Sequence, residues 1–163
     1  MKLIVNKAGK SEKYDLLRCV RRDGSETSTS MPRQGVLPHD LIHYVVETTL
    51  DYQHGFLGMV AAGAEISFAM EQSHGALQAG LADQASQTES LVESLQAQLW
   101  SDSFDQAMFD AGLESACAMR GCAVPALQQA GGGAALCDAV LALSQRWQAL
   151  PFYATLELDM PAL

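Results

Sequence analysis

The sequence predicts an α+β fold in which a small antiparallel sheet, built from an N-terminal meander and a C-terminal strand, packs against four or five helices. Short strand-like segments separated by turns fill residues 1–34, apolar spacing typical of helices runs through residues 37–150, and strict alternation marks residues 152–160. The chain has 163 residues, of which 48% are hydrophobic, so it is long enough for one well-covered core. We therefore expect a single domain over residues 1–163.

The N-terminal part predicts a strand meander. Residues 2–7 and 14–22 are rich in side chains that favour strands, and a polar turn at residues 9–11 separates them. Residues 23–24 are Asp-Gly, a pair typical of a tight reversal, and they lead into a third strand over residues 27–31. We expect these strands to pair in consecutive, antiparallel order.

A period of two predicts the C-terminal strand. Apolar side chains at Phe152, Ala154, Leu156, Leu158 and Met160 alternate with polar ones at Thr155, Glu157 and Asp159. A single strand is not stable alone and needs neighbours. The N-terminal meander offers the nearest edge, so we expect both ends of the chain to share one antiparallel sheet.

The first helix is predicted to begin at Pro38, because the N–H group that proline lacks would have no partner in the first turn. Its apolar stripe consists of Leu41, Ile42, Val45, Val46, Thr49 and Leu50, and it is expected to end near Asp51. Residues 55–63 are small and apolar, with glycines that permit close backbone approach, and residues 65–70 are expected to add another helical turn or two.

Residues 71–87 are rich in Gln, Ser, Ala and Gly and predict a mobile loop or a weak helix. Two capping patterns then predict helix starts, Ser86 with Glu89 and Ser103 with Gln106. Further along, the three glycines at 131–133 are expected to form a linker. A last helix follows, with its apolar face at Leu136, Val140, Leu143 and Trp147 and its end at Pro151.

The net charge of −9 is unevenly distributed. Residues 1–34 carry eight Lys or Arg against four acids, a balance of +4, whereas residues 35–163 carry two against fifteen, a balance of −13. An acidic body binds phosphate poorly, so we do not expect nucleic acid to be the main partner. The basic meander could instead meet an acidic partner or the acidic flank of a second copy, which makes a homodimer one expected assembly. The alternative is that these basic side chains form a solvated face of the hairpin.

No targeting or membrane segment is evident. The first 20 residues contain no apolar block of signal-peptide length, and the longest low-charge run, residues 55–64, is far shorter than the roughly 20 residues that span a bilayer. The four cysteines include no CxxC pair and are expected to be free thiols. These features predict a soluble, cytoplasmic protein without a membrane partner.

One segment of the first helix carries candidate chemistry, formed by His39, Asp40, His43 and Glu47. Histidines at i and i+4 share a helix face, where they can bind one metal ion, and Glu47 lies one turn further on. This spacing matches the zinc-hydrolase motif HExxH, although Asp40 stands where that motif has Glu. A divalent metal such as zinc is therefore a candidate cofactor, with His39, His43 and Glu47 as ligands. Asp40 would be the general base that acts on a metal-bound water.

Other residues are weaker candidates. His54, Glu65 or His74 could supply a further ligand, since all four histidines of the chain fall between positions 39 and 74. Glu65 has two interpretations, a charge at a helix N-terminus or a pocket carboxylate that faces His43. The structural alternative for the whole segment is that Asp40 caps the helix and the histidines bond backbone or neighbouring groups.

The segment 37–47 reads LPHDLIHYVVE and the segment 55–63 reads GFLGMVAAG. Together they resemble a signature of uncharacterised bacterial proteins, LPHDLxHYxVE followed by GFxGxVAxG, over about residues 35–66. The resemblance implies a bacterial source and no particular activity. It also makes the two segments one joint unit, which favours a site between them.

Two functions are expected from these observations. The first is a binding or interaction module, dimeric through a sheet edge or through its charge polarity. The alternative is a small metal-dependent hydrolase that uses the HDxxH helix.

Overall fold

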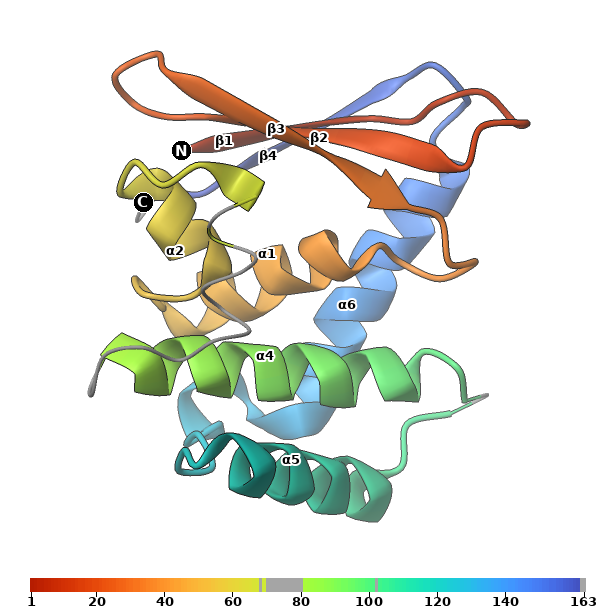
Figure 1. Ribbon diagram of the computed structural model, residues 1–163. Helices are drawn as coiled ribbons and strands as arrows, with labels where there is room; N and C mark the ends of the chain where they lie inside the picture. Colours follow the sequence, from red (N-terminus) through yellow and green to blue (C-terminus); the bar gives the residue numbers. More distant parts are fainter. Residues whose placement is uncertain (68, 70–80, 102, 162–163) are drawn as a thin grey trace.

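The computed structural model describes residues 1–67, 69, 81–101 and 103–161. Its four strands form one antiparallel sheet in the order β3-β2-β1-β4 (Figure 1), and the helices lie on one face of this sheet. The strands are β1 (Lys2–Asn6), β2 (Tyr14–Val20), β3 (Glu26–Pro32) and β4 (Thr155–Asp159). The predicted α+β class, with both ends of the chain in one sheet, is confirmed.

β1 lies in the middle of the sheet and sets its register. Leu3 pairs with Leu158 of β4 on one side and with Cys19 of β2 on the other. Because side chains alternate along a strand, these buried residues all point toward the helices. The sheet therefore contributes one apolar face to the core.

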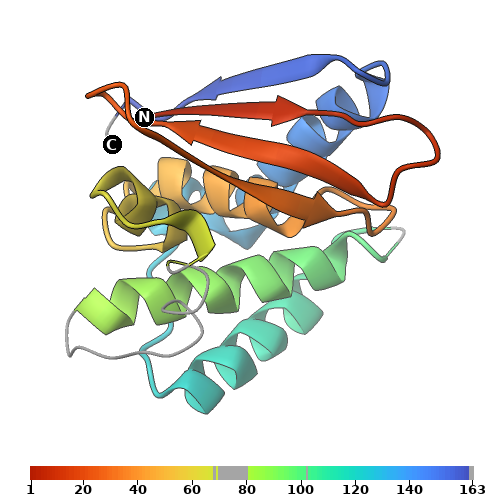
Figure 2. The same cartoon turned by 45° about the horizontal axis from the view of Figure 1, so that its top comes forward.

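The helices stack away from the sheet in layers (Figures 1 and 2). They are α1 (His39–Leu50), α2 (Phe56–Ala61), α4 (Leu81–Gln98), α5 (Gln106–Arg120) and α6 (Gly132–Ala149), with a 3₁₀ turn η1 (Gln128–Ala130) before the last. α1 lies directly under the sheet, α4 lies beneath α1, and α5 is farthest from the sheet. α4 is thus enclosed between two other helices.

α4 begins at Leu81, so residues 81–87 are helical and the pattern Ser86 with Glu89 lies inside the helix rather than at its start. The remainder of the segment predicted as a mobile loop or a weak helix, residues 71–80, lies outside the described residues. The polar composition of α4 is compatible with a buried helix because serine hydroxyls bond the backbone one turn back: Ser90 donates to the Ser86 carbonyl at 2.8 Å, and Ser94 to the Ser90 carbonyl at 2.8 Å.

Two other helix starts differ from the prediction. α5 is capped by Asp105, whose side chain accepts from the Met108 N–H at 2.9 Å, two residues beyond the predicted cap Ser103. The predicted glycine linker instead opens α6, and its third glycine is required by packing. A Cβ at Gly133 would lie 2.4 Å from Cε1 of Phe109, so only glycine lets these helices approach.

α1 follows the prediction closely. It begins directly after Pro38 and ends at Asp51, which adopts the left-handed conformation with φ 51°.

The four cysteines are free, as expected. Among the helices in the described part of the chain, none is both long enough and apolar enough to cross a membrane.

Candidate metal centre

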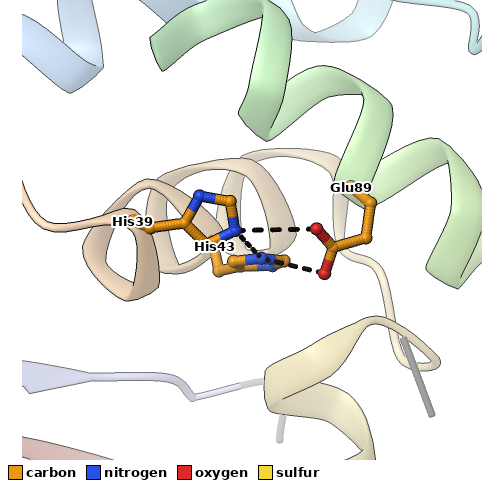
Figure 3. Close-up of side chains that lie close together, drawn as sticks. All are labelled: His39, His43 and Glu89. Atoms are coloured by element: carbon orange, nitrogen blue, oxygen red, sulfur yellow. Dashed lines mark hydrogen bonds and ion pairs between the residues drawn. The ribbon is translucent and has the colours of Figure 1, made fainter. Parts of the chain in front are cut away.

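α1 and α4 bring three side chains together where they cross: His39, His43 and Glu89 (Figure 3). The Nε2 atom of His43 lies 3.2 Å from Nε2 of His39 and 3.3 Å from Oε1 of Glu89. Nε2 of His39 lies 3.6 Å from Oε2 of Glu89. The three residues can each place one potential ligand atom within 4.8 Å of the other two.

The other ring nitrogen of each histidine faces an oxygen. Nδ1 of His43 lies 3.2 Å from Oε1 of Glu47, and Nδ1 of His39 lies 3.2 Å from Oε1 of Gln96. Because a carboxylate and an amide oxygen only accept, each ring carries its hydrogen on Nδ1. In the neutral rings both Nε2 lone pairs therefore point at one another and at Glu89.

The cluster is closed on its inner side and open at one end. The side chains of His43 and Glu89 are 2% and 4% exposed, whereas that of His39 is 35% exposed. The ring of Phe56 from α2 packs edge-on against His43, with ring centroids 5.1 Å apart. Solvent thus reaches the cluster from the His39 end, while the His43 ring is held in place.

Charge strongly shifts the proton affinities of this cluster. Burial alone would lower the pKa of His43, but its hydrogen bonds with Glu47 and Glu89 outweigh burial and raise that pKa to about 10. For Glu89, burial acts to raise the pKa, and the hydrogen bonds to His39 and His43 instead hold it far below its usual range. The cluster therefore favours a positive charge at the position of His43, next to an ionised Glu89.

Glu47 lies behind His43 rather than beside the other ligand atoms. Its Oε1 also accepts from the Leu57 N–H at 3.1 Å, and its Oε2 accepts from the Gly58 N–H at 2.9 Å. These are backbone groups in the first turn of α2, which have no partner within that helix. The residue predicted as third ligand thus supports the ring of His43, and Glu89 takes the place facing both histidines.

The remaining predicted site residues lie elsewhere. Asp40 is only 7% exposed and is not part of the three-residue cluster; burial is the main cause that raises its pKa. His54 is exposed in the turn between α1 and α2. Glu65 is exposed directly before the helical residue Ile66, and its carboxylate accepts from the Thr27 hydroxyl at 2.8 Å rather than facing His43. His74 lies outside the described residues.

Glu89 is the residue that the sequence analysis assigned to a helix cap. In the structure, Glu89 and Gln96 each contact a histidine of α1. The sequence offers one signal for this: the two residues are seven positions, or two helical turns, apart and so share a face of α4. That spacing does not reveal which helix packs against this face.

No family model, curated protein or solved structure matches the chain. The resemblance to the bacterial signature therefore stays a prediction.

Proposed function

We propose that this protein binds one divalent transition metal ion, with zinc preferred, through Nε2 of His39, Nε2 of His43 and the carboxylate of Glu89. The observation that carries the proposal is the arrangement of the rings. Both Nδ1 atoms face acceptors, so two Nε2 lone pairs and an ionised carboxylate converge on one point. Histidine ligands of metals are commonly oriented in this way by an acceptor on the far nitrogen.

The distances favour a tetrahedral ion. Bonds of about 2.0–2.2 Å to zinc place the ligands of a tetrahedron about 3.3–3.6 Å apart. The separations at this site are 3.2, 3.3 and 3.6 Å. An octahedral ion with bonds of about 2.0–2.1 Å, such as magnesium, would need neighbouring ligands about 2.8–3.0 Å apart. Two imidazoles and one carboxylate also form a typical zinc ligand set.

Charge balance supports the same conclusion. Two buried carboxylates, Glu47 and Glu89, flank the buried imidazole of His43. One imidazolium balances only one of these negative charges, whereas a divalent ion with neutral imidazoles balances both. Unbalanced buried charge is costly, so the site favours the divalent ion.

The competing occupant is a proton. As an imidazolium, His43 would donate from Nε2 toward Glu89 and His39, and no metal would be needed. Elemental analysis of the protein purified without a His tag, before and after mild chelation, separates the two cases. We expect about one zinc per chain. No metal, together with unchanged thermal stability on adding zinc, would contradict the proposal.

A matched pair of variants assigns the site. The double variant His39→Ala, His43→Ala should lose stoichiometric zinc and keep its circular dichroism spectrum. His54→Ala should bind zinc like the wild type, because His54 is exposed and lies outside the cluster. Equal zinc content in both variants would place the metal elsewhere.

Hydrolysis is a second candidate function, favoured by the solvent-facing side of the site. The described part of the chain supplies three ligand atoms, and the His39 side chain is 35% exposed. Catalytic zinc sites commonly have three protein ligands and a water, whose pKa the metal lowers to about 7. Turnover of esters, amides or phosphoesters that requires zinc, and that the double histidine variant lacks, would support this candidate. The role of Asp40 as general base stays a prediction.

Interaction with a partner also stays a prediction. β3 and β4 are the outer strands of the sheet, so their free backbone groups could pair with a second copy. Sedimentation analysis at several protein concentrations would test the homodimer.

The free thiols support the expected reducing, cytoplasmic compartment.

A further inference from the structure

One carboxylate joins the candidate metal centre to the start of α2. Glu47 is 1% exposed, and it accepts from the His43 ring at 3.2 Å and from the Leu57 and Gly58 N–H groups at 3.1 and 2.9 Å. The His43 contact sets which nitrogen carries the hydrogen, and the two backbone contacts satisfy donors that α2 cannot satisfy itself. A single side chain thus orients a ligand and anchors a helix.

Two glycines make this arrangement possible. A Cβ at Gly55 would lie 2.5 Å from Cδ of Glu47, and a Cβ at Gly58 would lie 2.2 Å from the Gln53 carbonyl oxygen. Real Cβ atoms do not come so close, so a side chain at Gly55 would collide with the carboxylate itself, and one at Gly58 would collide with the backbone of the turn before α2. Gly55 is therefore explained by the approach of this backbone to Glu47, and Gly58 by the packing of the preceding turn against α2.

We propose that Glu47 is the positioning residue of the metal centre: it holds His43 with Nε2 turned to the ion, and through the same carboxylate it couples metal binding to the order of α2. This inference rests on the proposed zinc site. Carboxylates in this position behind a ligating histidine typically contribute a factor of about 10–100 to metal affinity. α2 also supplies Phe56, whose ring packs against His43, so a metal that fixes His43 restrains α2 from two directions.

The first test compares zinc affinities by competition with a chromophoric chelator. Glu47→Gln should still bind one zinc per chain, but about 10–100-fold more weakly than the wild type. Glu93→Gln removes the same charge from an exposed position on α4, where Glu93 pairs with Arg120, and should bind as the wild type does. Wild-type affinity in Glu47→Gln would overturn the inference.

A second control separates positioning from stability. Leu113 is buried on α5, the helix farthest from the sheet, so Leu113→Ala should destabilise the fold without loosening α2 or removing any hydrogen bond of Glu47. We expect Leu113→Ala to lower the melting temperature and to leave zinc affinity within about threefold of the wild type, an allowance on the order of 0.65 kcal/mol. If Leu113→Ala loses as much affinity as Glu47→Gln for an equal fall in melting temperature, Glu47 has only a structural role and the inference fails.

Hydrogen exchange on the wild type tests the coupling without any variant, and so remains decisive if Glu47→Gln does not fold. Adding zinc should slow exchange of the Leu57 and Gly58 amides, which donate to Glu47. Unchanged exchange at these amides in the zinc-loaded protein would overturn the coupling. A wild type that binds no zinc would overturn the proposed function as well, whereas zinc binding that is insensitive to Glu47→Gln would overturn this inference alone.

Discussion

Nε2 of His43 on α1 lies 3.3 Å from Oε1 of Glu89 on α4, and both side chains are almost fully buried. α1 packs under the sheet, and α4 separates α1 from α5 (Figure 2). This ion pair therefore links α1, the helix packed on the sheet, to α4 in the outer layer of helices. A cation bound there would hold the two layers together.

Removing the charge of Glu89 should destabilise the metal-free protein. In Glu89→Gln the buried His43 loses one of its two ion pairs in the described part of the chain, and breaking one side of a buried ion pair typically costs about 3–5 kcal/mol. Urea denaturation of the chelated protein measures the free energy of unfolding. A loss of unfolding free energy below about 1 kcal/mol, the size expected for an exposed ion pair, would contradict a stabilising buried ion pair at this position.

Zinc should raise the melting temperature. At free zinc one hundred times the dissociation constant, the folded state gains about 2.7 kcal/mol. In a chain of this size that corresponds to a shift of roughly 5–10 °C. Differential scanning calorimetry should show the shift in the wild type and in His54→Ala. The double variant His39→Ala, His43→Ala should show none, and a shift in that variant would indicate binding elsewhere.

Zinc binding should release protons. In the metal-free protein the pKa of His43 is raised to about 10, so its ring is charged at neutral pH and must lose a proton from Nε2 before it can ligate. Apparent zinc affinity should therefore rise as pH increases from 6 toward 9, by about tenfold per unit for one released proton. Calorimetric titration in buffers of different ionisation enthalpy counts the protons. Identical heats in all buffers would argue against a protonated His43.

Cys19 should resist alkylation in the folded protein. Its side chain is fully buried on the inner face of β2, and burial, reinforced by the nearby Asp40, raises its pKa to about 12. The thiolate, which is the reactive form, is therefore scarce at pH 8. Mass spectrometry after brief iodoacetamide treatment should find Cys122, which is partly exposed, modified well before Cys19. Equal labelling of the two residues would show that the core opens readily.

Gly58→Ala should destabilise the protein, because its Cβ would lie 2.2 Å from the Gln53 carbonyl oxygen. Overpacking of this kind typically costs about 1–3 kcal/mol. Gly112→Ala is the matched control on α5, where the nearest atom to a Cβ is the Ser94 hydroxyl at 3.8 Å. That substitution should instead stabilise by about 0.5–1 kcal/mol, as alanine does inside a helix. Equal effects of both substitutions on the urea midpoint would contradict the close approach at Gly58.

The sheet and α1 were predictable because their signals are local. Alternation predicted a strand in residues 152–160 that needs neighbours, and β4 forms over Thr155–Asp159, although Phe152 lies exposed in the preceding turn. The histidine spacing on α1 follows from helix geometry alone. Within the site, the histidine pair could be identified in the same way.

Glu89 could not be identified, because its role depends on which helices cross. Locally, Ser86 and Glu89 match a capping pattern, and only the enclosure of α4 between α1 and α5 turns Glu89 toward His43. The role of Glu47 was hidden for a related reason. Its backbone partners Leu57 and Gly58 follow a turn whose course the sequence does not specify.

The position of β1 between β2 and β4 has a consequence for the order of folding. β1 and β2 are joined by a short turn and can pair as soon as both are synthesised, whereas β4 follows every helix in the chain. Pairing β1 with β4 closes a loop that contains all the helices described above, and the entropy cost of long loops slows folding. During synthesis, the sheet that covers α1 therefore stays one strand short until β4 has left the ribosome, although both helices of the candidate metal centre are already complete.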